Sequence, residues 1–254
     1  MINLEREAKI LEILKRNYFV TVSGLAELCY VTEATIRRDL TRLEKNGMVR
    51  RYHGGASLAY KNSDVPLSIR ESEDFNIKNL LGERCAKLAK PGNTLFMDCS
   101  STCAAIVPHL PNNIQLRVIT YGIKTALALS DRRINTFIAG GSILDNNHFA
   151  TGYYAENMLR DFYADICFIS TYGLSNDGRI CGPDIESIQL RQMMAKNAKR
   201  VVLVLASSKI GSDFFYTYGT IEDVDEVICD KALPNNLIQR IGNNRRHHYI
   251  NKLL

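Results

Sequence analysis

Apolar residues recur at helical spacing in the first part of the chain, and each run predicts a short amphipathic helix. One run covers residues 4–15, with an apolar stripe that includes Ala8, Leu11 and Leu14, and a second run covers residues 22–29. Polar residues occupy the other positions, so each helix has one face that packs inward and one that meets water. The spacing therefore predicts a small helical unit at the start of the chain.

A third helical run follows, and both of its ends are marked. Ile36, Leu40 and Leu43 fall at i, i+4 and i+7 and so share one face. Thr32 precedes the run and suits an N-cap, because its hydroxyl can accept a backbone N–H that the first turn leaves free. Gly47 follows the run and is typical of a helix C-terminus.

A basic strand and a glycine turn come next. Residues 49–53 have the alternation of a short strand, and Gly54 with Gly55 predicts the turn of a hairpin. Three helices followed by such a hairpin indicate a winged helix-turn-helix, which places one helix in the major groove of DNA.

The outer face of the third helix is rich in arginine and threonine. Thr35, Arg38 and Arg42 lie away from the apolar face, and arginine forks suit guanine edges and phosphates. Asp39 lies among these cations and is expected to orient an arginine. The candidate DNA-binding residues are Thr32, Thr35, Arg37, Arg38, Thr41, Arg42, Arg50, Arg51, His53 and Gly54. The alternatives are an arginine face that is merely solvated and a module that binds another protein.

From about residue 75 short apolar runs alternate with helical stretches. The predicted strands are 94–97, 117–120, 135–139, 165–170, 200–205 and 226–229, and the predicted helices are 75–90, 102–110, 122–131, 153–163, 185–199 and 233–242. This alternation predicts an α/β domain with a mostly parallel sheet covered on both faces. We expect a winged helix-turn-helix over 1–57, a linker over 58–74, and an α/β effector-binding and oligomerisation domain over 75–254.

The loops that follow the predicted strands hold the second group of candidate residues, because ligands of parallel sheets bind where strands end. Ser100, Ser101 and Thr102 open a helix and could cradle an anion, and Asp98 could accept hydrogen bonds from sugar hydroxyls. The candidate effector-binding residues are Asp98, Ser100, Ser101, Thr102, Gly140, Gly141, Gly152, Glu186 and Lys209. Each has a structural alternative: a helix cap for the hydroxyls, a tight turn for the glycines, a favourable helix dipole for Glu186 and a surface position for Lys209.

Composition narrows the class of protein. The formal net charge is only +5, so a basic DNA-binding surface must come from the placement of charges. The seven cysteines are scattered without a CxxC pair, which favours free thiols in a reducing cytoplasm over a metal site. The chain opens without a signal peptide, and no apolar run approaches the roughly 18 residues of a membrane helix. We expect a cytoplasmic protein without membrane contact, metal or cofactor.

Three motifs with intact spacing resemble a known family. Residues 35–40 (TIRRDL), 43–47 (LEKNG) and 51–56 (RYHGGA) are similar to the N-terminal signature of the DeoR family of bacterial transcriptional regulators, and the resemblance extends to about residue 230. It implies a sensor domain of sugar-phosphate isomerase-like α/β fold, without enzymatic turnover, that binds a phosphorylated sugar or related metabolite.

The predicted sensor site departs from the family pattern at three positions. Ser100 replaces the glycine of the usual phosphate loop, Tyr121 replaces an asparagine, and Ala206 replaces an aspartate. The matching positions are Gly140, Gly141, Gly152, Glu186 and Lys209. These departures bear on the identity of the effector more than on phosphate binding as such.

The sequence thus predicts a repressor of a carbohydrate-utilisation operon that binds double-stranded operator DNA as a homodimer or homotetramer. A small phosphorylated sugar or polyol is the expected effector, and no catalytic residue is predicted. One alternative is an isomerase-type enzyme fused to a DNA-binding domain, with Asp98 or Glu186 as its base. Another is a regulator whose sensor is non-functional because of Ser100, Tyr121 and Ala206.

Overall fold

The computed structural model describes residues 3–17, 19–58, 67–112, 114–143, 148–241 and 246–249. The chain divides into two compact units, Met1–Glu73 and Asp74–Leu254. Of the stretch predicted as a linker, residues 59–66 lie outside the described residues, while Leu67–Ser72 form helix α4.

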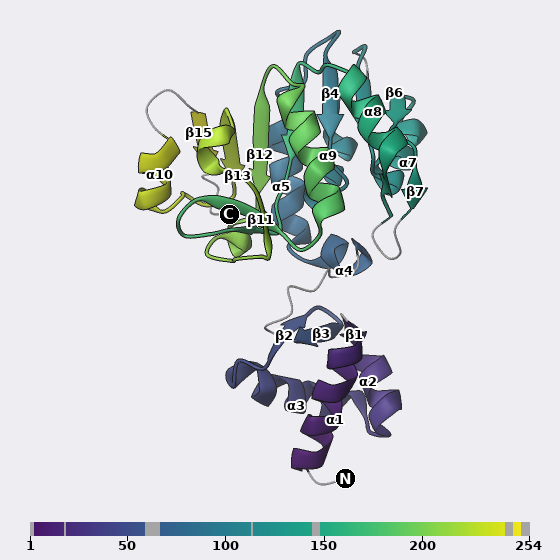
Figure 1. Ribbon diagram of the computed structural model, residues 1–254, viewed down its shortest axis with the longest axis vertical. Coiled ribbons are helices and arrows are strands. Elements are labelled where there is room, and N and C mark those ends of the chain that lie inside the picture. Colours follow the sequence, from purple (N-terminus) through teal and green to yellow (C-terminus); the bar gives the residue numbers. More distant parts are fainter. Residues whose placement is uncertain are drawn as a thin grey trace. The chain divides into compact units, whose positions relative to one another are not determined.

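Before α4, the described residues of the first unit form three helices and a small antiparallel sheet (Figure 1). The helices are α1 (Asn3–Arg16), α2 (Val22–Cys29) and α3 (Glu33–Lys45), and the strands are β1 (Val20–Thr21), β2 (Val49–Tyr52) and β3 (Gly55–Leu58), in the order β1-β3-β2. Ile36, Leu40 and Leu43 of α3 are all buried in the core of this unit, as their spacing predicts. The predicted winged helix-turn-helix is confirmed.

Helix α1 buries only part of the predicted stripe: Leu11 and Leu14 contact the core as predicted, and Ile10 joins them. Ile10 and Leu14 are fully buried, whereas Ala8 is exposed. Arg6 lies one turn before Ile10 and is also buried, because Asp39 of α3 accepts its hydrogen bonds. The buried stripe therefore includes an arginine, which a pattern of apolar residues does not reveal.

The two ends of α3 are closed as the sequence predicts. The Thr32 hydroxyl accepts the backbone N–H of Thr35 at 3.3 Å. At the other end, Gly47 has φ +67° and donates its N–H to Glu44, and the next residue donates to the carbonyl of Leu43. This pair of bonds is the Schellman motif, which favours glycine because φ is positive.

The wing turn lies one residue earlier than predicted. Tyr52 pairs with Gly55, so His53 and Gly54 form the turn and Gly55 is the first residue of β3. Gly55 is buried, and a Cβ there would lie 2.2 Å from the ring of Phe19. Gly55 is therefore required for close packing, whereas Gly54 is required because the turn has φ +89° there.

The second unit contains a parallel sheet in the strand order β15-β14-β12-β9-β4-β5-β6, in which every neighbouring pair is parallel. The strands are β4 (Thr94–Met97), β5 (Arg117–Thr120), β6 (Asn135–Ile138), β9 (Ile166–Ile169), β12 (Val201–Leu205), β14 (Glu226–Cys229) and β15 (Arg246–Tyr249). The helices are α5 (Phe75–Ala86), α6 (Ser101–Ala104), α7 (Ile123–Asp131), α8 (Tyr153–Asp161), α9 (Ile185–Lys196) and α10 (Asn235–Ile241). The predicted α/β class with a parallel sheet is confirmed.

Helices cover both faces of this sheet. Strand β4 sends Phe96 into a core shared with α8, α9 and α10, and sends Leu95 and Met97 into a second core shared with α5, α6 and α7. Alternate side chains of a strand point to opposite faces, so a strand buried on both sides is apolar throughout. Figure 1 shows α9 crossing one face and α5 lying behind the other.

Several predicted elements differ from the observed ones. The predicted helix 102–110 is a short helix, α6, followed by a 3₁₀ turn at Val107–His109, because Pro108 cannot continue an α-helix. The predicted helix 75–90 ends at Ala86. An additional antiparallel sheet of β10 (Gly173–Leu174), β11 (Arg179–Gly182) and β13 (Tyr216–Thr220), and the pair β7 (Ser142–Ile143) and β8 (Ala150–Thr151), were not predicted.

All seven cysteines are buried free thiols. Across the described residues, no helix combines the length and the apolar content that a membrane crossing requires.

Candidate nucleic-acid interface and sensor site

The arginines on the outer face of α3 differ in whether they form an ion pair. Arg38 is exposed and makes no ion pair with any described residue. Arg37 pairs with Glu33 one turn earlier, at 2.7 Å, and 57% of its side chain remains exposed. Arg38 is therefore the arginine of this helix that can meet a new partner without first leaving a carboxylate.

Arg42 is held more firmly than its position in the sequence suggests. Its Nε donates to Glu7 of α1 at 2.8 Å, and an Nη atom donates to Asp39. Asp39 is 1% exposed and also accepts from Arg6, with Nε to Oδ2 at 2.5 Å. Asp39 thus orients two arginines, and Arg42 joins α3 to α1 as well as lying near the candidate interface.

Arg6 belongs to this network but was not among the candidate residues. Its hydrogen bond to Asp39 raises the pKa of Arg6 above the usual value, since the carboxylate favours the charged guanidinium. A cation in line with Ile10 and Leu14 at helical spacing was the signal in the sequence.

The wing packs against α3 through polar contacts. Arg51 donates to the Thr41 hydroxyl at 2.6 Å, and its backbone N–H donates to Glu44 at 3.1 Å. Arg50 lies over the ring of Tyr52, with 5.6 Å from its guanidinium carbon to the ring centroid. His53 and Gly54 are exposed at the turn. Arg51 therefore fixes the wing to the helix, whereas Arg50 contacts a residue of its own strand.

Thr32 and Thr35 lie at the N-terminus of α3, with their hydroxyl oxygens 3.0 Å apart. The first turn of a recognition helix is the part that contacts base edges in a helix-turn-helix. The structure thus brings Thr32, Thr35 and Arg38 onto the exposed N-terminal half of one helix, and leaves Thr41, Arg42 and Arg51 in contacts within the unit.

In the second unit, three loops meet at the carboxyl edge of the parallel sheet. The Lys209 ammonium donates to Thr102, which follows β4, and to Ser170, which follows β9, with both distances 3.2 Å. Lys209 itself follows β12 in a 3₁₀ turn, Ser207–Lys209. Because β12, β9 and β4 are neighbours, their ends bring these residues together. Ser170 was missed, because a single serine after a strand carries no distinctive pattern.

Asp98 is fully buried, and its oxygens already accept four hydrogen bonds. The donors are the N–H and hydroxyl of Ser100, at 2.9 and 2.5 Å, the N–H of Ser170 at 2.9 Å and Nε of Arg191 at 3.0 Å. Burial alone would raise the pKa of Asp98, but the Arg191 charge and these hydrogen bonds outweigh it and lower the pKa below its usual value. Asp98 therefore fixes the loop, and no carboxylate oxygen is left for the sugar hydroxyls that the sequence analysis expected it to bind.

Arg191 is the buried partner that sequence analysis did not identify. It is 1% exposed, donates to the Ser187 hydroxyl at 2.7 Å, and lies 5.8 and 5.9 Å from the ring centroids of Tyr172 and Tyr218. In the sequence it is one of several polar residues of α9, and only the packing of α9 on the sheet selects it.

Ser100, Tyr121 and Ala206, the three residues that depart from the family pattern, are all buried. The Ser100 hydroxyl caps α6 by accepting the N–H of Cys103 at 3.1 Å. Tyr121 packs edge-on against Phe149, and its hydroxyl has no hydrogen-bond partner among the described residues. Ala206 is fully buried before the turn that carries Lys209. Burial also raises the pKa of the Tyr121 hydroxyl.

The remaining candidate residues lie in other segments than Lys209, although only β5 separates β6 from β4, which precedes Thr102. Gly140 and Gly141 follow β6, at the same edge of the sheet, but β9, β4 and β5 separate β6 from β12. A Cβ at Gly141 would lie 2.1 Å from the carbonyl oxygen of Thr151, so this glycine allows β7 to approach β8. Gly152, with φ +96°, precedes α8, and Glu186 is half-buried in the first turn of α9 behind its N-cap Asp184.

Both units match families of known proteins. The family described as "DeoR-like helix-turn-helix domain" matches residues 6–62, and "DeoR C terminal sensor domain" matches residues 73–231. The HTH-type transcriptional regulator GolR of Listeria innocua is 30% identical, over 94% of this chain and 95% of that protein. The glycerol-3-phosphate regulon repressor of Escherichia coli is 28% identical, over 92% of this chain and 94% of that protein. Among solved structures, ribose 5-phosphate isomerase A of Methanocaldococcus jannaschii aligns with 54% of this chain and 55% of that chain, with TM-score 0.41 and 15% identity.

Proposed function

Because the chain belongs to the DeoR family of transcriptional regulators, we propose that it represses a carbohydrate-utilisation operon and leaves its operator when a phosphorylated sugar or polyol binds. The protein is a DNA-binding regulator, as its relatives over nearly the whole chain are. Repression, the operon and the effector are the parts that we propose.

Arg38 carries the DNA-binding part of the proposal. It lies on the exposed side of α3, one turn after Thr35, without an ion pair among the described residues. A guanidinium in this position can donate two hydrogen bonds to one guanine edge. Arg37, Arg50 and His53 then supply phosphate contacts, while Arg42 and Arg51 set the position of α3 and the wing.

The proposed regulator acts as a homodimer or homotetramer held by its α/β units. A helix-turn-helix of this kind reads one half-site, and two copies reach half-sites one or more helical turns apart. We place it in the cytoplasm, where its regulatory relatives would meet the chromosome.

Lys209 is the main support for the proposed effector site. Its ammonium lies at the carboxyl edge of the sheet and donates to the neutral hydroxyls of Thr102 and Ser170. A phosphate offers charged oxygens in place of those hydroxyls and would accept stronger hydrogen bonds. The E. coli relative is named for glycerol 3-phosphate, which supports a phosphorylated polyol as one candidate.

The DNA-binding proposal is tested with an operator selected from a pool of random duplexes. Arg38→Ala should weaken operator binding by about 1–3 kcal/mol in fluorescence anisotropy, with the loss of discrimination confined to one base position. Arg16→Ala is the matched control, since Arg16 is an exposed arginine of α1 that pairs only with Glu12 in the described structure. Wild-type operator affinity in a folded Arg38→Ala variant would contradict the assignment.

The effector proposal is tested on the operator complex. Glycerol 3-phosphate and a set of pentose and hexose phosphates are added, and one of them should weaken operator binding about 5- to 150-fold. Lys209→Gln should abolish that response and leave operator affinity unchanged, whereas Lys196→Gln, an exposed change on α9, should preserve it. If no phosphorylated compound has an effect, the proposal of a phosphorylated effector fails and the DNA-binding assignment stands.

The enzyme alternative receives no support. The relatives that match nearly the whole chain are named regulators. A general base works best with a pKa near the working pH, but Asp98 is buried, fully hydrogen-bonded and has a lowered pKa. We assign no catalytic residue.

A further inference from the structure

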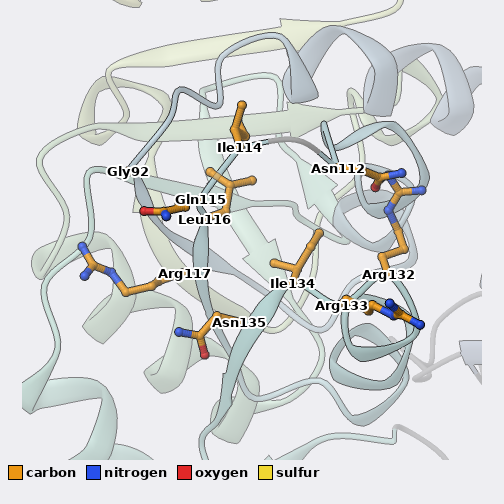
Figure 2. Close-up of a pocket in the computed structure, with 10 residues that line it drawn as sticks. All are labelled: Gly92, Asn112, Ile114, Gln115, Leu116, Arg117, Arg132, Arg133, Ile134 and Asn135. Atoms are coloured by element: carbon orange, nitrogen blue, oxygen red, sulfur yellow. The ribbon is translucent and has the colours of Figure 1, made fainter.

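A cavity lies at the edge of the parallel sheet opposite Lys209, where β5 and β6 begin (Figure 2). Its volume is about 400 Å³, which falls in the range of small-molecule sites. Lys209 and Thr102 lie at the carboxyl ends of strands, whereas Arg117 and Asn135 are the first residues of their strands. The cavity is therefore separate from the proposed effector site.

Three arginines surround the cavity. Figure 2 shows Arg117 on one side and Arg132 with Arg133 on the other. No carboxylate is among the lining residues, and none of the three arginines forms an ion pair with a described residue. Guanidinium groups gathered without counter-charges favour an anionic ligand.

Arg132 has a structural task at this site. It donates to the carbonyl of Leu110 at 2.5 Å and to the Asn112 side chain, so it ties the segment before β5 to the end of α7. Arg117 is exposed and uses its Nε in one hydrogen bond to Thr94, at 3.1 Å. Arg117 and Arg133 thus remain as the arginines that can turn toward a ligand.

Arg133 occupies a position that favours glycine. Its φ is +57°, it donates its N–H to Ser130, and Ile134 donates to Leu129, which is the Schellman motif at the end of α7. Helix α3 ends in the same way with Gly47. A positive φ is unfavourable for a residue with a Cβ, and strained residues that persist cluster at functional sites. A cation also favours the C-terminal dipole of α7, but Arg117 lies on a strand and has no such role.

The rest of the lining is apolar or amide. Ile114, Leu116 and Ile134 form an apolar surface between the arginines in Figure 2. Gln115 and Asn135 are exposed beside it and carry both donors and acceptors. The site therefore combines an apolar surface, amides and cations around one cavity.

We propose that this cavity binds a nucleotide, a nucleoside mono- or diphosphate, with its base on the apolar surface and its phosphate on Arg117 and Arg133. The amides would meet polar edges of the base or the ribose. A sugar phosphate satisfies the arginines but leaves the apolar surface uncovered. A DNA duplex presents an extended row of phosphates and cannot enter a cavity of about 400 Å³.

The test is calorimetric titration of the full-length protein with ADP, AMP and GMP. At least one should bind saturably, and Arg117→Gln and Arg133→Gln should each weaken it about tenfold. Arg84→Gln, an exposed change on α5 away from the cavity, should not, and Lys209→Gln should leave nucleotide binding intact. Arg133→Gly should raise the melting temperature while weakening binding, because it relieves the positive φ and removes the charge. A purely structural arginine would not give these opposite signs.

Several outcomes overturn the proposal. Absence of saturable binding by all three nucleotides does so, as does equal weakening in the Arg84→Gln control. Ribose 5-phosphate binding as tightly as ADP, with the same dependence on Arg117 and Arg133, would show an anion site without base recognition. Binding lost in Lys209→Gln but kept in the arginine variants would place the nucleotide at the effector site. Release of the operator by sugar phosphates is measured separately, so either proposal can fail alone.

Discussion

At the scale of single residues, the second unit depends on one buried ion pair. Arg191 and Asp98 are 1% and 0% exposed, and come from α9 and from the loop after β4. Two charges removed from water are tolerated only when each is fully hydrogen-bonded, and removal of one partner leaves the other uncompensated. Here Asp98 also holds Ser100 and Ser170, so the same pair fixes two of the loops that carry the proposed effector site.

We predict that Asp98→Asn lowers the free energy of unfolding by about 3–5 kcal/mol, because Arg191 stays buried without a carboxylate. Urea unfolding monitored by circular dichroism measures the change. Glu83→Gln, which removes a surface pair with Lys87, should change stability by only a few tenths of a kcal/mol. Equal stability of Asp98→Asn and wild type would mean that Arg191 finds other acceptors.

The same pair predicts a dependence of stability on acid. The pKa of Asp98 in the folded protein lies below its value in the unfolded chain, which is about 3.9. The unfolded chain thus binds the proton first, so the stabilisation is complete above pH ~4 and declines as pH falls toward the folded pKa. The stability difference between wild type and Asp98→Asn should therefore shrink below pH ~4. A difference that is constant with pH would contradict the lowered pKa.

At the scale of elements, α3 is defined by its ends and by its contacts with α1. Thr32 closes the N-terminus and Gly47 the C-terminus. Asp39 and Arg42 join α3 to α1 through Arg6 and Glu7. These contacts fix the orientation of α3. The position of Arg38, which we propose contacts DNA, therefore depends on residues that do not contact DNA themselves.

We predict that Gly47→Ala destabilises the first unit by about 1 kcal/mol, and Gly47→Asn by less. A Cβ at Gly47 would have no atom within 4 Å, so the cost comes from the backbone at φ +67° and not from a clash. Asparagine tolerates the left-handed region better than alanine does. Thermal unfolding of the three proteins gives the order, and an alanine variant more stable than the asparagine variant would refute this account of the helix end.

At the scale of the whole molecule, function requires that two separately packed units influence each other. The core of the first unit, which runs from Ile10 to Leu58, and the two cores of the second unit are distinct clusters. An effector can change operator binding only through a difference in its affinity for two states of the protein. The required coupling of 1–3 kcal/mol is small beside the stability of a domain.

We predict that the coupling is reciprocal. If an effector weakens operator binding by a given factor, saturating operator DNA must weaken effector binding by the same factor. Calorimetric titration of the effector with and without the operator duplex measures the second factor. Unequal factors would indicate that the effector competes at a further site or that the oligomer dissociates.

Much of the first unit could be read from local pattern. Caps, apolar periodicity and a glycine at a helix end act over a few residues, and they located α3 and the wing closely. The prediction failed where a long-range partner decides burial. Arg6 counts as polar in any periodicity, but Asp39, 33 positions later, makes it part of the core in place of Ala8.

In the second unit central strands such as β4 and β12 were predictable because they are buried on both faces and therefore apolar. The edge strand β15 was not predicted, because its sequence, Arg246 to Tyr249, is polar. The antiparallel sheet of β10, β11 and β13 was not predicted either, because β10 has only two residues and Cys181 of β11 pairs with Thr217 of β13 from a distant chain segment. Their pairing has no local signal.

By itself the sequence determined the two kinds of domain, the helix that faces outward with Arg38, and the loops that contain Thr102 and Lys209, because periodicity, caps and strand ends are local properties. Only the tertiary structure decided which polar groups are already engaged. It directs Asp98 to Arg191 and Arg42 to Glu7, joins Lys209 to Ser170, and gathers Arg117 and Arg133 around one cavity. The reason is that a charge acts through the partner nearest in space, and the packing of distant segments sets that partner.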